Sequence, residues 1–455
     1  MYEPPRPTAL AAIVSLLRVA ARGDGDLLSL LPSKAYRVDA GWLGYSRRSI
    51  LLVNEPELLR EVLTDPLGIF PKNDLMVGAL EPLVGNSIFV SSGTVWRRQR
   101  QMIEPSFSHM RLSKAFAAMT GALDDYETRL DELAVSGGRF SLDLAMSHLT
   151  ADVICRTVFS TSLRSQTAID VFEAFTVFER TCAQVELRRL IFDPPFNDIP
   201  QHAAVIDACE RIRKHLGDLV DTHLADGASQ WDDIAAEIIT ARDVETGGGF
   251  TRKELLDQLG VMFLAGHETT ASALTWAFLM IGMQPQVLQR MREEIATIAG
   301  DGPLTLEQVR RLTYVKNVFR ESLRLYPPIP FIPRVAAEPA KIGRHEVKRG
   351  AMIMIAPWTI HRHKKYWRSP NAFDPDRFSS EREHEILPST YLPFGLGPRV
   401  CVGAGFATLE ATAILARLVR RYDITVHDAA RVRPIARLTI RPERQLMCTV
   451  RRRAS

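Results

Sequence analysis

The decisive stretch of this sequence is Phe394-Gly395-Leu396-Gly397-Pro398-Arg399-Val400-Cys401-Val402-Gly403. It offers one thiolate in a glycine-rich loop, and no second metal ligand stands nearby. Zinc sites and iron–sulfur clusters need several ligands together, whereas the other cysteines occur singly, at Cys155, Cys182, Cys209 and Cys448. A glycine-flanked cysteine alone is more often an inert buried thiol. If the cysteine does bind a metal, a lone axial sulfur indicates haem iron, and the glycines let the backbone approach a flat macrocycle.

Four further stretches corroborate the haem interpretation: Trp96-Arg97-Arg98-Gln99-Arg100, Ala265-Gly266-His267-Glu268-Thr269-Thr270, Glu321-Ser322-Leu323-Arg324 and Pro375-Asp376-Arg377-Phe378. With the cysteine loop, they stand in the order found in the cytochromes P-450, the haem-thiolate monooxygenases. From about residue 30 to its C-terminus, the chain resembles that family. The resemblance implies a mainly α fold with a small β region, in which haem b lies between a long central helix and the cysteine loop. It also implies one domain over residues 1–455, although length alone would suggest about three domains.

The same resemblance assigns residues to the haem. Cys401 is expected to bind the iron. Haem carries two propionates, which are costly to bury without cationic or hydrogen-bonding partners. Trp96 and Arg100 are four residues apart and would share one helix face, where an indole N–H and a guanidinium can hold one carboxylate. The full set of expected haem contacts is Trp96, Arg100, Arg334, Arg399, Phe394, Gly395 and Gly403.

A long helix is predicted from Thr251-Arg252-Lys253-Glu254, a capping-box pattern, to about Gly282. Apolar residues surround most of it, so it should pass through the core. Its polar centre is anomalous there, because Ser and Thr hydroxyls can bond back to carbonyls and bend a helix, and a widened turn beside the iron is expected.

The family pattern gives that polar centre a catalytic purpose. Thr269 is expected to hold the proton donor for oxygen cleavage, and Glu268 to relay protons from solvent through water. Gly266 would leave room for oxygen. His267 should face away from the iron, since a lone His in a helix usually forms only an ordinary hydrogen bond.

Glu321 and Arg324 are three residues apart on another predicted helix, and Arg377 arrives from a distant loop. An isolated pair with this spacing is usually a surface bridge, but the accompanying motif favours a buried ionic triad that fixes geometry. Asp376 replaces the Glu that the family usually has, which leaves Arg377 intact.

Composition limits the function classes. A net charge of +4 is too small to indicate nucleic acid binding, and five cysteines without framework spacing indicate a reducing, cytoplasmic setting. The apolar run from Leu10 to Leu17 is too short to span a membrane, so a short surface helix and no integral membrane anchor are expected, with peripheral membrane contact as an alternative. A monomer is expected.

Electrons should come from a separate protein, because only about 54 residues follow Cys401 and no dinucleotide-binding loop is present. A ferredoxin or flavodoxin with its NAD(P)H-dependent reductase is the expected donor. Arg97, Arg98 and the side of the molecule near the cysteine loop would form its basic docking face. The basic run His361-Arg362-His363-Lys364-Lys365 is interpreted as a solvated face, with an acidic partner as the alternative.

The predicted reaction is insertion of one oxygen atom from O2 into an apolar small molecule. Substrate contacts are expected from 70–90, from Phe263 and Leu264, from 329–332, and from Leu438-Thr439, mostly apolar stretches. A peroxide-driven peroxygenase or rearrangement catalyst, and a haem-thiolate gas sensor without turnover, are the alternatives. Short strands are expected at 36–38, 48–53 and 351–355.

Overall fold

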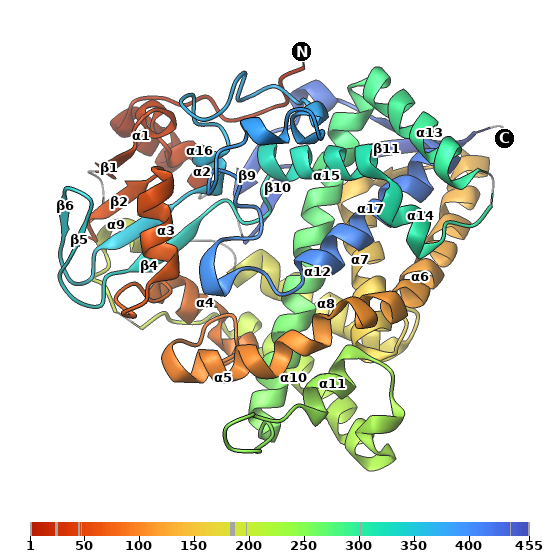
Figure 1. Cartoon of the computed structure of the whole chain (residues 1–455), viewed down its shortest axis with the longest axis horizontal. Coiled ribbons are helices and arrows are strands. Elements are labelled where there is room, and N and C mark those ends of the chain that lie inside the picture. The colour runs from red at the N-terminus through yellow and green to blue at the C-terminus, as the bar shows by residue number, and fades with distance from the viewer. Residues whose placement is uncertain are drawn as a thin grey trace.

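The computed structural model describes residues 2–22, 26–43, 46, 48–182, 187–196, 198–300, 302–436 and 438–453. Helices dominate it (Figure 1). The α-helices are α1 (Ala12–Arg22), α2 (Leu27–Leu30), α3 (Pro56–Thr64), α4 (Asp74–Val84), α5 (Gly93–Ile103), α6 (His109–Ser136), α7 (Leu142–Phe159), α8 (Gln166–Cys182), α9 (Leu187–Phe192), α10 (Ala203–Asp226), α11 (Ile234–Thr240), α12 (Arg252–Gly282), α13 (Pro285–Ala299), α14 (Leu306–Arg311), α15 (Thr313–Leu325), α16 (Pro357–Ile360) and α17 (Ala404–Arg421).

The strands form small sheets. They are β1 (Ala40–Leu43), β2 (Ile50–Val53), β3 (Arg139–Ser141), β4 (Ile332–Val335), β5 (Ala340–Ile342), β6 (His345–Val347), β7 (Met352–Ile355), β8 (Tyr422–Val426), β9 (Pro434–Ala436), β10 (Ile440–Pro442) and β11 (Met447–Arg452). The largest described sheet has the order β1-β2-β7-β4, with β2 and β7 parallel. The mainly α architecture with a small β region is therefore confirmed.

The strands predicted at 48–53 and 351–355 are found as β2 and β7, whose side chains are mostly buried. The strand predicted at 36–38 is wrong. Residues Ser33–Tyr36 instead form a 3-10 turn, and the first strand starts only at Ala40. The Tyr36 ring is held by tertiary contacts, since its hydroxyl accepts a hydrogen bond from Trp358, and such contacts override a local β preference.

Helix α12 is the central element of the core and runs through the middle of the molecule in Figure 1. Thr251 and Glu254 form the predicted capping box at its N-terminus. The helix is continuous from Arg252 to Gly282, so no widened turn interrupts it. It packs mainly against α7 on one side and against α10, α15 and α4 elsewhere.

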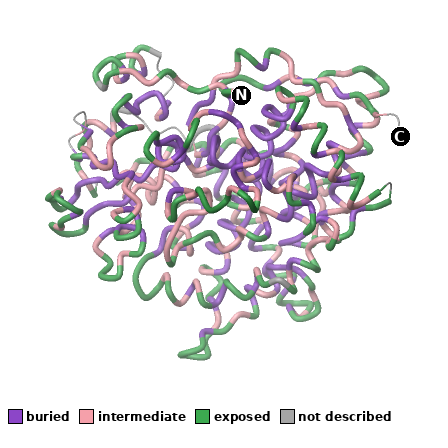
Figure 2. Tube along the Cα trace, turned by 45° about the horizontal axis from the view of Figure 1, so that its top comes forward, coloured by how far each residue is buried: buried purple, intermediate pink, exposed green. Residues whose placement is uncertain are grey.

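Burial decreases from the centre of the molecule outward (Figure 2). The predicted surface position of the His361–Lys365 run is wrong for its first three residues, which are buried, whereas Lys364 and Lys365 are exposed. Arg362 lies 3.6 Å from the centre of the Trp358 ring, and burial lowers its pKa to about 9. Its guanidinium donates to the carbonyls of Trp358 and Leu325, which compensates for part of its burial.

Helix α1 confirms the short surface helix expected near the N-terminus. Within the described part of the chain, no helix combines the length and the hydropathy that crossing a bilayer would take.

Candidate active site

The cysteine loop is a compact turn that leads directly into α17. The Cys401 N–H donates to the carbonyl oxygen of Phe394 at 2.9 Å, which closes the loop. Cys401 is exposed to the surface, although desolvation by the surrounding protein raises the pKa of its thiol. The N–H of Gly403 and the charge of Arg100 oppose that rise and favour the thiolate. The loop therefore presents one sulfur with an amide aimed at it.

Two glycines of the loop have backbone conformations that other residues rarely adopt. Gly395 has a φ of 79° and Gly397 a φ of 76°. A Cβ at Gly397 would also lie 2.8 Å from the carbonyl oxygen of Leu63. Gly395 meets no atom within 4 Å on its Cβ side, so the backbone there faces open space that a flat ligand can approach.

Three cations, Lys72, Arg334 and Arg399, converge beside the loop. Burial and the charges of the two arginines hold the pKa of Lys72 well below its usual range. Burial lowers the pKa values of Arg334 and Arg399 to about 10, although the Asp65 carboxylate partly opposes this in both. No carboxylate of the described chain forms an ion pair with any of them. One guanidinium nitrogen of Arg399 is buried with no partner among these residues. Such a cluster is unfavourable unless an anion completes it, so it fits a ligand that carries carboxylates.

Helix α5 places Trp96 and Arg100 against the cysteine loop, where they contact different residues. The Arg399 guanidinium lies 4.5 Å from the centre of the Trp96 ring. Arg100 donates to the Val400 carbonyl oxygen at 2.7 Å and to the Glu104 carboxylate at 3.1 Å. Arg100 therefore anchors the cysteine loop, a contact that the four-residue spacing did not reveal.

The expectation that Arg98 belongs to a free basic face is wrong. Its guanidinium pairs with Glu254 at 2.6 Å and with Asp243 at 3.5 Å, and it donates to the Gly249 carbonyl oxygen. It thus fastens α5 to the start of α12, and two carboxylates neutralise its charge. Arg97 is exposed, as expected.

On α12, only Ala265, Gly266 and Thr269 keep accessible surface between Asp257 and Ile281. The Thr269 hydroxyl donates to the Ala265 carbonyl oxygen at 2.7 Å, which leaves its oxygen able to accept a hydrogen bond.

Gly266 is needed for helix packing. A Cβ there would approach the Ile154 side chain of α7 to 2.5 Å. The absence of a side chain at Gly266 therefore lets α7 pack closely against α12. The space expected for oxygen at this position stays a prediction.

Glu268 is buried rather than solvent-facing. Its carboxylate accepts hydrogen bonds from Thr439 at 2.5 Å and from Arg441 Nε at 2.8 Å. Arg441 also pairs with Glu179 of α8 at 2.9 Å. Burial disfavours the charged carboxylate, but Arg441 outweighs it and lowers the pKa of Glu268. A proton relay through Glu268 would therefore require its release from Arg441.

Two residues of the predicted substrate contacts have partners within the protein. Thr439 is buried and donates to Glu268. Phe263 belongs to an aromatic cluster with Phe175 and His267, at ring separations of 5.5 and 5.0 Å. His267 is itself buried there, with its pKa lowered to about 4 by burial, so it is neutral. It lies in this cluster, as expected of a residue that does not bind iron.

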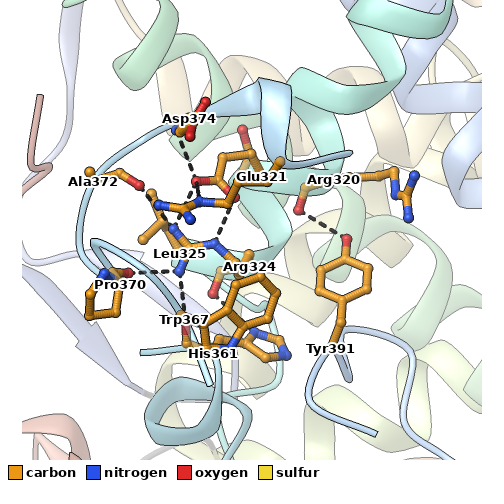
Figure 3. Close-up of polar contacts among 12 residues, drawn as sticks. Arg320, Glu321, Arg324, Leu325, His361, Trp367, Pro370, Ala372, Asp374 and Tyr391 are labelled. Atoms are coloured by element: carbon orange, nitrogen blue, oxygen red, sulfur yellow. Dashed lines mark hydrogen bonds and ion pairs between the residues drawn. The ribbon is translucent and has the colours of Figure 1, made fainter. Parts of the chain in front are cut away.

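The predicted triad is present and buried. Figure 3 labels two of its members, Glu321 and Arg324. Arg324 binds both oxygens of Glu321, at 2.6 and 2.7 Å, and Arg377 Nε reaches the same carboxylate at 3.3 Å. The remaining guanidinium N–H groups donate to backbone carbonyls, including those of His361 and Pro370. The triad thus joins α15 to the stretch from His361 to Arg377, which precedes the cysteine loop in the sequence.

Two residues of the site were missed from the sequence. Lys72 lies in the 70–90 segment expected only to contact substrate, and its β-bridge to Arg334 brings it to the cluster. Arg441 gave no usable signal, because its partner Glu268 lies far along the chain. In each case the tertiary fold, rather than local spacing, creates the role.

Comparison with known proteins agrees with this geometry. The Cytochrome P450 family model matches residues 4–449. Cyclooctatin synthase of Streptomyces melanosporofaciens is 30% identical over 432 residues, covering 94% of this chain and 90% of that protein. Cyclooctat-9-en-7-ol 5-monooxygenase of the same organism is 32% identical, covering 93% and 86%. The chain therefore belongs to the cytochrome P450 family, whose members carry haem on a cysteine thiolate, and it is an oxidoreductase of the monooxygenase type.

The fold agrees with solved structures. The crystal structure of the cytochrome P450DA heme domain superposes with a TM-score of 0.80 at 23% identity, covering 91% of this chain and 89% of that chain. This likeness confirms the cytochrome P-450 fold expected from the motifs.

Proposed function

We propose that this protein inserts one oxygen atom from O2 into an apolar small molecule, at a haem b bound by Cys401. The observation that carries the proposal is the cluster of Lys72, Arg334 and Arg399 beside the cysteine loop, which forms no ion pair with any carboxylate of the described chain. Two propionates would neutralise that cluster, and Trp96 would support it through Arg399. The haem, when bound, supplies the oxygen activation chemistry, and the thiolate donates electron density that favours O–O cleavage.

Noncovalent haem b is the cofactor that best suits the sequence. The chain contains no Cys-x-x-Cys-His stretch, which c-type attachment needs. Phe394, Gly395 and Gly403 would border the macrocycle, because the loop backbone approaches without side chains in the way. Acidified organic solvent should extract the haem completely.

The protein's own residues then control protons. Thr269 has already committed its hydroxyl proton to Ala265, so its oxygen accepts a hydrogen bond and holds a water molecule in place. Glu268 stays charged while Arg441 and Thr439 hold it, and it can pass a proton only when it rotates away from them. Gly266 lets α12 pack closely on α7 at this turn.

We propose a cyclic, mainly hydrocarbon substrate. Half-buried apolar side chains of the predicted contact segments, Leu75, Met76 and Phe331, pack next to the core and favour an apolar ligand. The relative named cyclooctat-9-en-7-ol 5-monooxygenase acts, by its name, on an unsaturated alcohol, which agrees with this class. A panel of such compounds should shift the absorption spectrum of the ferric protein.

Electrons would come from an acidic ferredoxin or flavodoxin served by an NAD(P)H-dependent reductase, in the cytoplasm, with this chain acting as a single-domain monomer. Exposed Arg97 on α5 is the cation we place in the docking face, next to Arg100 and the exposed Val400 of the loop. Arg97→Glu should slow reduction by a ferredoxin about tenfold at low salt, because association is electrostatically guided. Arg310→Glu, an exposed charge on α14, is the control and should leave the rate unchanged.

The cofactor assignment is tested by adding carbon monoxide to the reduced holoprotein. A strongly red-shifted absorption band is expected of thiolate-bound haem. Cys401→Ser should abolish the band, whereas Cys209→Ser, at a buried free cysteine, should keep it. A Cys401→Ser protein that retains the band would overturn the proposal.

A further inference from the structure

The connection between α4 and α5, residues 85–92, is built of turns and irregular backbone, and side chains of α12 hold it in place. The Asn86 N–H donates to the Asp257 carboxylate at 3.1 Å, and the Ile88 N–H donates to the Gln258 side-chain oxygen at 3.0 Å. Asp257 and Gln258 are neighbours on α12, and both are buried. Helix α12 therefore fixes two backbone amides of a segment that forms neither a helix nor a strand.

A buried ion pair holds Asp257 against this connection. Arg213 of α10 donates to the Asp257 carboxylate at 2.7 Å and to the Leu83 carbonyl oxygen near the end of α4 at 2.9 Å. Gly85 has a φ of 47°, and a Cβ there would clash with the Asp257 carboxylate. Helices α4, α10 and α12 pack against one another (Figure 1). The Asp257 carboxylate thus joins three helices to one stretch of backbone.

The other end of the connection meets α5 and the cysteine loop. Gln99 of α5 donates to the Asn86 carbonyl oxygen at 2.8 Å and accepts a hydrogen bond from the Ser91 hydroxyl at 2.7 Å. Arg399 of the cation cluster donates to the Ser91 carbonyl oxygen at 2.7 Å. The backbone of the connection is therefore bonded to side chains of α12, of α5 and of the cysteine loop.

Apolar side chains of the connection lie beside the cation cluster. Ile88 and Phe89 are half-buried and pack next to the core, and the centre of the Phe89 ring lies 3.8 Å from the Lys72 ammonium nitrogen. Asp257 precedes Thr269 by twelve residues, which is about 18 Å along a helix. Asp257 can therefore influence the site beside Thr269 only through the connection.

We propose that Asp257 and Gln258 are positioning residues for the substrate pocket, because they fix the α4–α5 connection, whose apolar side chains form one wall of that pocket. A segment that is already held in its binding conformation loses less conformational freedom when a ligand arrives, which favours affinity. The two residues determine how tightly a bulky apolar molecule binds and take no part in the oxygen chemistry. The inference rests on the proposed function for the location of the pocket beside the haem.

Hydrogen–deuterium exchange of the holoprotein tests the positioning directly. Gln258→Met keeps a side chain of similar length but removes the oxygen that accepts from the Ile88 N–H. The amides of residues 85–92 should then exchange about tenfold faster, because opening of the segment no longer breaks this bond. A second variant, Asp257→Leu with Arg213→Met, removes the buried pair as a unit and strands no charge. It should speed exchange in the same segment.

Two iron ligands of different size separate positioning from general damage. Imidazole needs only the iron, whereas N-adamantylimidazole also fills the space beside it with a cyclic hydrocarbon. In absorption titrations of the ferric holoprotein, both variants should bind N-adamantylimidazole about tenfold more weakly than the wild type does. They should bind imidazole as tightly as the wild type, and their carbon monoxide complexes should keep the same band.

The matched control is Glu294→Met. The Glu294 carboxylate of α13 accepts hydrogen bonds from the amides of Tyr314 and Val315 at 2.7 and 2.9 Å, so it fixes backbone in the same way at α15. The control should speed exchange at the start of α15 and leave the dissociation constants of both imidazoles unchanged.

The proposal fails if Gln258→Met leaves exchange of residues 85–92 unchanged, or if it weakens imidazole and N-adamantylimidazole equally. It also fails if the Glu294 control weakens N-adamantylimidazole as much. A wild type whose carbon monoxide complex lacks the red-shifted band would instead overturn the proposed function, and the exchange result would still decide whether Asp257 and Gln258 fix the connection.

Discussion

Among the described residues, one guanidinium nitrogen of Arg399 and both carboxylate oxygens of Glu410 are buried without a hydrogen-bond partner, yet the two side chains lead to opposite conclusions. Arg399 belongs to a cluster of like charges, so an external anion is needed to complete it. Glu410 of α17 has neither a cation nor any hydrogen bond of ordinary geometry among the described residues. Burial raises its pKa well above the usual value, and the Thr270 hydroxyl only partly offsets this. Glu410 is therefore protonated in the folded protein.

The protonated state of Glu410 predicts a pH-dependent stability. The unfolded chain ionises this carboxyl above about pH 4.5, whereas the folded chain keeps the proton, so folding is penalised as the pH rises. Glu410→Gln should be more stable than wild type at pH 7, and the gain should shrink as the pH falls toward 4.5. Urea unfolding at several pH values measures this.

Glu268→Gln is the control, because it should change the stability of the protein in the opposite direction. Arg441 lowers the pKa of Glu268, so its stabilising charge is present above about pH 4.5 and is lost only as the pH falls further. The substitution should destabilise the protein equally at pH 7 and pH 5. A Glu410→Gln effect that follows this same trend would contradict a neutral Glu410.

Thr269 gives the second prediction at this scale. Thr269→Ala removes the oxygen that holds a proton donor. The rate of product formation should therefore fall by up to ~10²-fold, the contribution expected of such a group. NAD(P)H oxidation should continue and yield hydrogen peroxide. The control is Thr275→Ala, one turn and a half further along α12, where the hydroxyl makes the same 2.7 Å bond to the carbonyl four residues back. Unchanged coupling in Thr269→Ala would remove the assigned role.

Helix α12 shows how far sequence patterns reach at the scale of an element. Its limits and its capping box followed from local chemistry, because caps act within one turn. The role of Gly266 did not, since the residue that fills its space, Ile154, comes from α7. The burial of Glu268 was missed for the same reason, as Arg441 lies far along the chain. Periodicity gives the face of a helix but does not identify its neighbours.

The contact between α12 and α7 makes a testable pair. Gly266→Ala should cost about 1–3 kcal/mol because its Cβ would clash with the Ile154 side chain. Ile154→Ala alone should cost about 2–5 kcal/mol as a cavity. The double variant should lose clearly less stability than the sum of the two single losses. The methyl group of the new alanine at 266 would occupy space that Ile154→Ala vacates. Strict additivity in denaturant unfolding would show that the two helices are not in this contact.

Across the whole molecule, the motifs predicted the fold and the triad correctly because they belong to a family pattern that spans most of the chain. The His361–Lys365 run shows the limit of composition. A dense positive charge normally indicates solvent, but carbonyls at the ends of α15 and α16 and the Trp358 ring surround Arg362. Burial of polar residues depends on partners that only the assembled fold supplies.

The triad provides the last prediction, because it joins distant segments through fully buried charges. Glu321→Gln would leave Arg324 and Arg377 facing each other without a carboxylate, so unfolding should become easier by about 3–5 kcal/mol. Asp376→Asn breaks the exposed Arg290–Asp376 pair at 2.8 Å and should cost only about 0–1 kcal/mol. Denaturant midpoints of the two holoprotein variants make the comparison. Equal losses would mean that the Glu321 carboxylate is solvated and that the scaffold does not depend on it.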